Sequence, residues 1–136
     1  RHDKPVAHVR RHGPHVAAGA MTHIGVQIAA FGFSGMEVET ACRYRLPITF
    51  IVINNNGIGS GETVLSEPVP PNVYTPSARY ERVIEAFGGR GFFVTTPDEL
   101  RKALTQAALE TMPTLINVMI NPQSTRKPQK FDWLTR

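Results

Sequence analysis

Three consecutive asparagines follow a strongly apolar run and are the side chains of this sequence best suited to binding a ligand. Residues 48–53 are β-branched, apolar or aromatic almost throughout, which is typical of a parallel strand covered on both faces. Asn54, Asn55 and Asn56, followed by Gly57, stand where that strand would end. This is the edge at which open α/β sheets bind ligands. The alternative is a turn capped by its own side-chain amides.

A glycine-rich stretch before this strand is the second candidate for ligand binding. Ser34 and Glu37 have the spacing of a capping box and predict a helix over about residues 35–44. Gly32 and Gly35 would let a ligand approach the backbone closely, and a helix N-terminus favours an anion such as phosphate. The alternative is a glycine-rich turn that only leads into a capped helix.

Residues 1–28 contain all five histidines and read as an irregular arm. His8 and His12 could bind a metal together with His15 on a helix, but Gly13 and Pro14 interrupt any helix there. A nucleic-acid role is opposed by the lack of aromatic residues between the basic ones. Those basic residues are Arg1, Lys4, Arg10 and Arg11.

The composition favours one modest soluble domain. The chain has 136 residues, 41% of them hydrophobic, and no stretch long and apolar enough to span a bilayer. Its single cysteine, Cys42, excludes an internal disulfide, fits a reducing compartment and is expected to be buried on a helix. Much of the net charge of +4 comes from the amino-terminal arm.

The remaining pattern alternates helices and strands and predicts an α/β fold with a doubly wound parallel sheet. We expect helices from Thr75 and Pro76 to residue 87 and from Thr96 and Pro97 onward, and strands over residues 91–94 and 114–120. Residues 59–76 read as a long loop that could cover an active site. No clear strand precedes residue 31, so the first strand is expected to be missing.

Residues 29–136 resemble the diphosphate-binding domain of thiamine diphosphate enzymes, in particular the group of 2-hydroxyacyl-CoA lyases and oxalyl-CoA decarboxylases. The resemblance is carried by FGFSGMEVETACRYRLPITFIVINNNGI, YERVIEAFGGRGFFVTTPDELRKAL and TLINVMINPQSTRKPQKFDWLTR. It implies three parts: an irregular or foreign arm over residues 1–28, a domain fragment over 29–120 and a tail over 121–136. Phe131 and Trp133 of the tail are expected to dock on the domain.

The same resemblance implies the cofactors thiamine diphosphate and Mg²⁺. It assigns the metal to the side chain of Asn55 and the carbonyl of Gly57, and it places backbone of Ile58 near the diphosphate. Hard oxygen ligands of this kind suit Mg²⁺. The further positions beside the cofactor are Ala29, Ala30 and Phe31.

One departure from the family pattern concerns the metal. The family has Gly-Asp-Gly or Gly-Asp-Ser before this stretch, whereas this chain has Gln27, Ile28 and Ala29. The aspartate position falls on Ile28, whose side chain has no ligand atom, and no acid lies between Asp3 and Glu37. Cofactor binding is therefore doubtful. The segment before residue 31 is either a remnant joined after loss of the strand and aspartate, or foreign sequence.

The resemblance implies cleavage of a 2-hydroxyacyl-CoA to an aldehyde and formyl-CoA, with the cofactor supplying the electron sink. We expect no catalytic residue on this chain and no activity from it alone, because the activating glutamate belongs to a pyrimidine-binding domain that another chain must supply. The family further implies a homo-oligomer and a peroxisomal location. The chain ends in Leu134, Thr135 and Arg136, which is unlike a peroxisomal targeting tripeptide; otherwise a cytoplasmic location is expected.

Two other functions remain open at this stage. The chain could be a non-catalytic remnant that acts as a dimerisation or interaction module through an uncovered sheet face. It could also be a small nucleotide-binding α/β protein, although it has neither a strand-linked GxGxxG nor a GxxxxGK[ST] loop.

Overall fold

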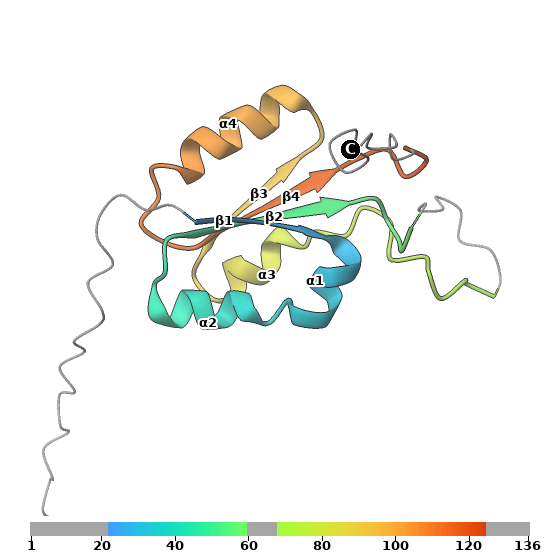
Figure 1. The fold of residues 1–136 in the computed structure, drawn as a ribbon, viewed down its shortest axis with the longest axis horizontal. Helices are drawn as coiled ribbons and strands as arrows, with labels where there is room; N and C mark the ends of the chain where they lie inside the picture. The colour runs from blue at the N-terminus through green and yellow to red at the C-terminus, as the bar shows by residue number, and fades with distance from the viewer. Residues whose placement is uncertain (1–21, 60–67, 125–136) are drawn as a thin grey trace, which may run out of the picture.

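The computed structural model shows a parallel four-stranded sheet between two layers of helices (Figure 1). It describes residues 22–59 and 68–124, and residues 22–29 by their backbone only. The elements in chain order are β1 (Thr22–Gln27), α1 (Ile28–Ser34), α2 (Glu37–Tyr44), β2 (Ile48–Asn54), α3 (Glu81–Ala86), β3 (Arg90–Val94), α4 (Pro97–Ala107) and β4 (Thr114–Met119). The strand order is β1-β2-β4-β3.

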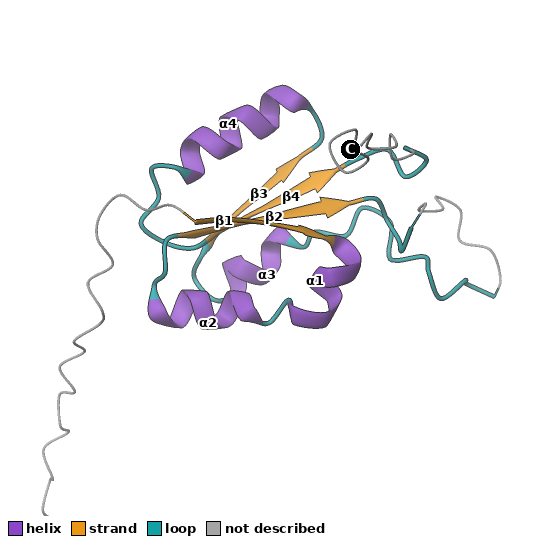
Figure 2. Cartoon of the chain, viewed as in Figure 1, coloured by secondary structure: helices purple, strands orange, loops and turns teal. Residues whose placement is uncertain are grey.

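The α/β class and the parallel sheet are confirmed. β2 and β4 lie at the centre, and each is parallel to both of its neighbours. Five of the six residues of β4 are buried, as expected of a strand covered on both faces. In Figure 2 the sheet, drawn in orange, has α4 on one face and α1, α2 and α3 on the other.

Two apolar cores fill the space between the layers. One lies between the sheet and α1 to α3, and the other lies beneath α4. The first includes Phe31, whose ring meets Tyr80 edge-on with 5.9 Å between the ring centroids. Cys42 is buried in the same core as expected, and burial raises the pKa of its thiol, so the thiol stays protonated and unreactive at neutral pH.

The expectation that the first strand is missing is wrong. Residues 22–27 form β1, which pairs in parallel with β2 from Thr22 opposite Ile48 to Gln27 opposite Ile53. An edge strand needs only one hydrogen-bonded neighbour, so its short, glycine-containing sequence carries a weak signal. The prediction of an irregular arm is therefore wrong for residues 22–28, and residues 1–21, with the histidines His8, His12 and His15, lie outside the described part.

The capping box predicted for Ser34 and Glu37 is also wrong, although the helix does end at Tyr44. Ser34 lies in the last turn of α1, where its Oγ donates to the carbonyl of Ala30 at 3.5 Å. Met36 is the N-cap of α2 and makes no side-chain cap. A residue that is already helical cannot take the extended conformation that capping requires.

The third helix starts later than predicted. Thr75 and Pro76 do not begin α3, whose N-cap is Tyr80. Ser77 has φ +54°, a left-handed conformation that a continuous helix cannot contain. Gly88 follows the helix with φ +83°, as expected for a glycine after a helix C-terminus.

The capping box predicted at the start of α4 is confirmed. The Thr96 hydroxyl accepts from the Glu99 N–H at 3.2 Å, and the Glu99 carboxylate accepts from the Thr96 N–H at 3.2 Å. We expect Thr96→Ala to lower the free energy of unfolding by about 1 kcal/mol. Urea denaturation at pH 7 measures the loss, with Ser34→Ala as the control because that hydroxyl caps no helix. Equal losses in both variants would contradict this assignment.

The same box makes stability depend on pH. Hydrogen bonds donated by the backbone of Thr95, then by its hydroxyl, lower the pKa of Glu99 below its ordinary value of 4.5. A lowered pKa in the folded state stabilises the fold above pH 4.5, and this contribution is lost as the pH falls through the folded pKa. Glu99→Gln should therefore match the parent chain in acid and be less stable at neutral pH.

Candidate functional site

The carboxyl ends of β1 and β2 lie side by side and place the candidate residues at one edge of the sheet. Gln27 pairs with Ile53, so the start of α1 at Ile28 lies beside the turn after β2. Asn55 and Gly57 form that turn. The sheet therefore brings the start of α1, with the positions Ala29 and Ala30 that the resemblance assigned to the cofactor, beside this turn. The other stretch, Gly32 and Gly35, lies toward the far end of α1.

The Asn55 side chain closes its own turn. Its Nδ2 donates to the carbonyl of Gly59 at 2.6 Å, and its Oδ1 accepts from the Gly57 N–H at 3.4 Å. The second distance is long for a hydrogen bond, so this oxygen is weakly held. Of the two polar atoms of the Asn55 side-chain amide, this oxygen is the one that could become a metal ligand.

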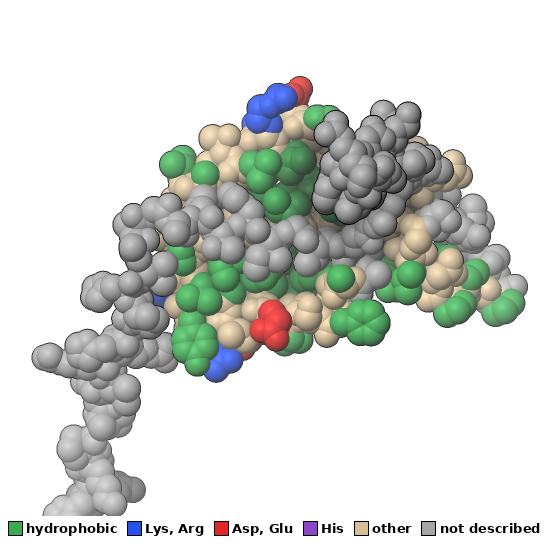
Figure 3. Space-filling model, in the orientation of Figure 1, with side chains coloured by type: hydrophobic (Ala, Val, Ile, Leu, Met, Phe, Trp, Pro, Cys, Tyr) green, Lys and Arg blue, Asp and Glu red, His purple; other side chains and the backbone are tan. Residues whose placement is uncertain are grey.

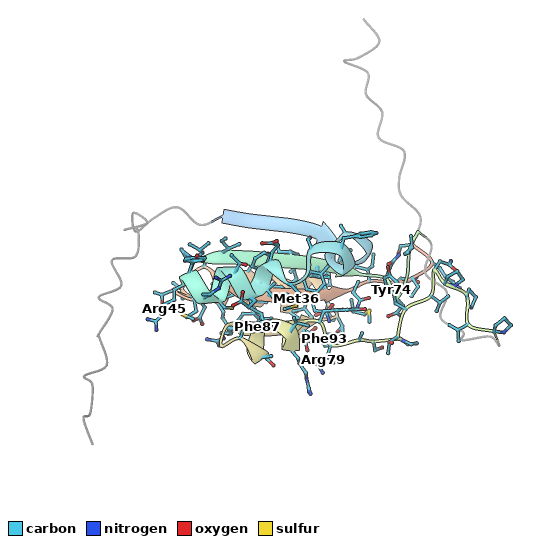
Figure 4. All side chains as sticks on the ribbon, turned by 90° about the horizontal axis from the view of Figure 1, so that it is seen from below. Met36, Arg45, Tyr74, Arg79, Phe87 and Phe93 are labelled. Atoms are coloured by element: carbon cyan, nitrogen blue, oxygen red, sulfur yellow. The ribbon has the colours of Figure 1, made fainter. Side chains whose placement is uncertain are left out.

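Asn56 connects the turn to a distant segment. It has φ +64°, and its carbonyl accepts from the Tyr74 N–H at 2.8 Å. The Ile58 N–H donates to the carbonyl of Asn72 at 2.9 Å, so Gly57 and Val73 form an antiparallel bridge. Figure 4 shows Tyr74 on this returning segment, beyond the end of the sheet. That segment belongs to the loop predicted over residues 59–76; residues 60–67 lie outside the described part.

The other candidate residues differ in their surroundings. Phe31 is buried against Tyr80 in the core, so only its backbone could face a ligand. Ala30 is exposed, Gly57 is buried, and the Ile58 side chain is 47% exposed. Of Ala29 only the backbone position is described, at the start of α1.

These residues fit a magnesium ion poorly. Mg²⁺ in proteins is usually held by one or two carboxylates that replace part of its water shell. Asn55 and Gly57 offer two neutral oxygens, and the neighbouring helix begins with the hydrocarbon side chain of Ile28. Among the described residues, no group of three or more histidine, cysteine, aspartate or glutamate side chains could hold a metal. Within residues 22–59 and 68–124 the site therefore has no charged ligand.

A buried polar network next to this edge was not predicted from the sequence. The Asn117 Nδ2 donates to the carbonyl of Ala78 and to the Glu81 carboxylate, both at 2.9 Å. Glu81 is 2% exposed and also pairs with Arg79. The one available signal was a lone asparagine within the apolar run TLINVMI. A polar residue buried in a central strand needs a partner, and periodicity alone does not identify it.

In the described part of the segment after the turn, from residue 68 to Glu81, the side chains of Tyr80 and Glu81 are poorly suited to act as a base at neutral pH. Burial raises the pKa of Tyr80, and the nearby Tyr74 raises it further, so the Tyr80 phenol stays protonated. Glu81 directly follows Tyr80, and Asn117 and Arg79 already bind its carboxylate. Within the described residues this edge of the sheet is thus suited to holding a ligand and not to proton transfer.

Residues 29–118 match the family described as the C-terminal TPP-binding domain of thiamine pyrophosphate enzymes. Among curated proteins, 2-hydroxyacyl-CoA lyase 1 of Homo sapiens is 52% identical over 120 residues, covering 79% of this chain and 21% of that protein. Oxalyl-CoA decarboxylase of Escherichia coli K12 is 49% identical over 98 residues, covering 69% of this chain and 17% of that protein. The chain thus spans about a fifth of the length of the curated relatives that it matches.

A solved structure agrees with this match. The thiamine diphosphate-dependent 4-hydroxybenzoylformate decarboxylase of Rhodococcus jostii superposes with a TM-score of 0.58 at 25% identity. The superposition covers 74% of this chain and 19% of that chain. The family match over residues 29–118 and the shared fold lead to one conclusion. This chain belongs to the family of C-terminal thiamine pyrophosphate-binding domains of thiamine pyrophosphate enzymes.

Proposed function

We propose that this chain supplies the cofactor-binding part of a thiamine diphosphate-dependent lyase that cleaves 2-hydroxyacyl-CoA to an aldehyde and formyl-CoA. The observation that carries the proposal is the pairing of Gln27 with Ile53, which places the start of α1 beside the turn of Asn55 and Gly57. The resemblance assigns the cofactor's diphosphate and metal to these two segments. The 52% identity to a 2-hydroxyacyl-CoA lyase supports the substrate class.

In this proposal the chain binds and orients and performs no proton transfer. Thiamine diphosphate, when bound, supplies the carbanion and the electron sink. The carbonyl of Gly57 and the Oδ1 of Asn55 would hold Mg²⁺, and backbone of Ala29, Ala30, Phe31 and Ile58 would lie along the diphosphate. Because the described part of the site has no carboxylate and the family's aspartate position is Ile28, we propose that the chain alone binds the metal weakly and is inactive.

The proposed partners are the other parts of such a lyase. A pyrimidine-binding domain from another chain would complete the site, in a homo-oligomer, and a 2-hydroxyacyl-CoA would be the substrate. A peroxisomal location follows from the resemblance and belongs to the same proposal. No helix within the described residues is long and apolar enough to cross a bilayer.

A chimera of the human 2-hydroxyacyl-CoA lyase 1 tests the proposal. One version would carry residues 29–136 of this chain in place of the matching residues of the lyase, behind the lyase's own preceding sequence. A second version would begin at residue 22 of this chain and so contain Ile28. We expect aldehyde release from a 2-hydroxyacyl-CoA by the first chimera and at least about tenfold less by the second, because the second lacks the acidic ligand. A folded but inactive first chimera would contradict the proposal.

Exposed apolar side chains favour a second candidate function, that of an interaction module. Phe33 is 94% exposed, Met36 64% and Tyr44 60%, all on or between α1 and α2. In the space-filling view, apolar side chains drawn in green reach the surface of this lower layer (Figure 3). Several large exposed apolar groups on one layer of a domain are one mark of an interface. If both chimeras are inactive yet assemble as the lyase does, the interaction module is favoured.

A further inference from the structure

Three asparagine side chains hold one short segment beside the turn. The Nδ2 atoms of Asn54 and Asn117 both donate to the carbonyl of Ala78, at 3.4 and 2.9 Å. The Oδ1 of Asn56 accepts from the Ser77 N–H at 3.0 Å. Asn54 is the last residue of β2 and Asn56 lies in the turn after it, whereas Asn117 comes from the middle of β4. Residues 77 and 78 are thus tied to both central strands.

The tied segment and the turn both contain a left-handed residue. Asn56 has φ +64°, which asparagine adopts readily, and Ser77 has φ +54°, which costs about 1 kcal/mol for a serine. Asn54 also accepts from the Asn56 N–H at 3.0 Å through its Oδ1. Such conformations persist where surrounding contacts hold them, and here the contacts are side-chain amides.

Asn117 is the member of this group whose burial costs most. It is fully buried, and among the residues that the structure describes its Oδ1 has no hydrogen-bond partner. An unsatisfied buried acceptor costs about 1–3 kcal/mol, and the rest of β4 is mainly apolar. The amide is used only as a donor, to Ala78 and to Glu81. An apolar side chain would avoid the unsatisfied oxygen but would leave Ala78 with the longer bond from Asn54.

Glu81 fixes the orientation of the Asn117 amide. Its buried carboxylate accepts from Nδ2, so the opposite orientation would set the amide oxygen against a carboxylate and a carbonyl. Arg79 pairs with the same carboxylate and lies over the ring of Phe93, 4.3 Å from the ring centroid. Figure 4 shows Arg79 and Phe93 close together, away from Tyr74. The donor atom of Asn117 is therefore held toward Ala78.

We propose that Asn117 is a positioning residue for the turn of residues 55–58, acting through Ala78 and Ser77. By holding residues 77–78 in place, it keeps the returning segment against Asn56 and Ile58, which sets the direction of the Gly57 carbonyl. This inference rests on the proposed function, which makes that turn the metal and diphosphate site. It adds a residue of β4 that does not itself touch the ligand.

Amide hydrogen exchange on this chain tests the inference without any cofactor. In Asn117→Leu we expect at least about tenfold faster exchange at the amides of Ile58, Tyr74 and Ser77, with amides inside β2 and β4 unchanged. Asn121→Leu is the matched control, because Asn121 lies just after β4 and, among the described residues, its side chain bonds only to the exposed Gln123 N–H. If Asn117→Leu does not fold, Asn117→Ser, which is smaller and cannot reach Ala78, takes its place.

Two results would overturn the inference. Unchanged exchange at all three amides would show that Asn117 does not hold the segment. An equal increase throughout the sheet, together with a lower free energy of unfolding, would show a purely structural role.

A second measurement uses the first chimera described above. There Asn117→Leu should raise the half-saturating concentration of thiamine diphosphate with Mg²⁺ by about tenfold and change the saturating rate little. An unchanged half-saturating concentration would remove Asn117 from the cofactor site. Because the exchange measurement needs no cofactor, failure of the proposed function and failure of this inference give different results.

Discussion

Ile28→Asp should give this chain a measurable affinity for thiamine diphosphate with Mg²⁺. Ile28 is the first residue of α1 and directly follows β1, whose last residue pairs with Ile53. An aspartate there would lie at the same edge as Asn55 and Gly57. It would add the charged hard oxygen ligand that Mg²⁺ prefers, and a carboxylate is also favourable at a helix start.

We expect the affinity to rise about 100-fold, which corresponds to about 2.7 kcal/mol. Isothermal titration calorimetry of thiamine diphosphate with and without Mg²⁺ measures it. Ser34→Asp is the matched control, because it adds the same charge at the other end of α1. Ile28→Asn supplies an oxygen ligand without a negative charge, so it should give a smaller gain in affinity than Ile28→Asp.

Two calorimetric results would contradict a metal site at this edge of the sheet. If circular dichroism shows that Ile28→Asp is folded and yet no heat above that of the parent chain is seen, the metal site does not lie at this edge. If Ser34→Asp gives the same gain, the effect is general attraction of the metal complex to added charge. Either result would remove Asn55 and Gly57 as metal ligands.

Gly91→Ala should destabilise the fold more than any other alanine substitution proposed here. A Cβ at Gly91 would lie 2.6 Å from the carbonyl oxygen of Glu81 and 2.7 Å from the Glu85 Oε1. The first neighbour is backbone, so β3 and α3 would have to separate. We expect a loss of about 3 kcal/mol in the free energy of unfolding and a Tm lower by about 10 °C.

Gly32→Ala is the control for this substitution. Gly32 lies within α1, is exposed, and an added Cβ would meet nothing within 4 Å. Alanine is the better helix former, so the chain should become more stable by up to about 1 kcal/mol. Urea denaturation of both variants measures the difference. Similar losses in the two would show that α3 does not pack closely on β3.

Local sequence signals predicted the elements whose residues all favour the same structure. The apolar run of β2, the short strand β3 and the start of α4 at Thr96 were correct because hydrophobic pattern and cap chemistry agree within a few residues. The resemblance likewise depends on contiguous motifs, and the family match over residues 29–118 confirms it. The site residues Asn55, Gly57 and Ile58 stay a prediction carried by that resemblance.

Other features depend on contacts between distant residues and could not be read locally. β1 exists because β2 offers it a hydrogen-bonding edge, and its own sequence is only weakly strand-like. Ser34 fails as a cap because the residues before it are already helical. Thr75 fails because Ser77 is left-handed, and the side chain of Asn56, in the turn after β2, accepts from its N–H.

The sequence by itself determined the α/β class, the central strand and the turn at its carboxyl end. Only the tertiary structure decided that β1 is present, that α1 starts beside this turn, and that Asn117 reaches Ala78 across 39 positions of the chain. The physical reason is that periodicity and capping are set by neighbours along the chain. A hydrogen bond between distant residues depends on how the sheet brings them together.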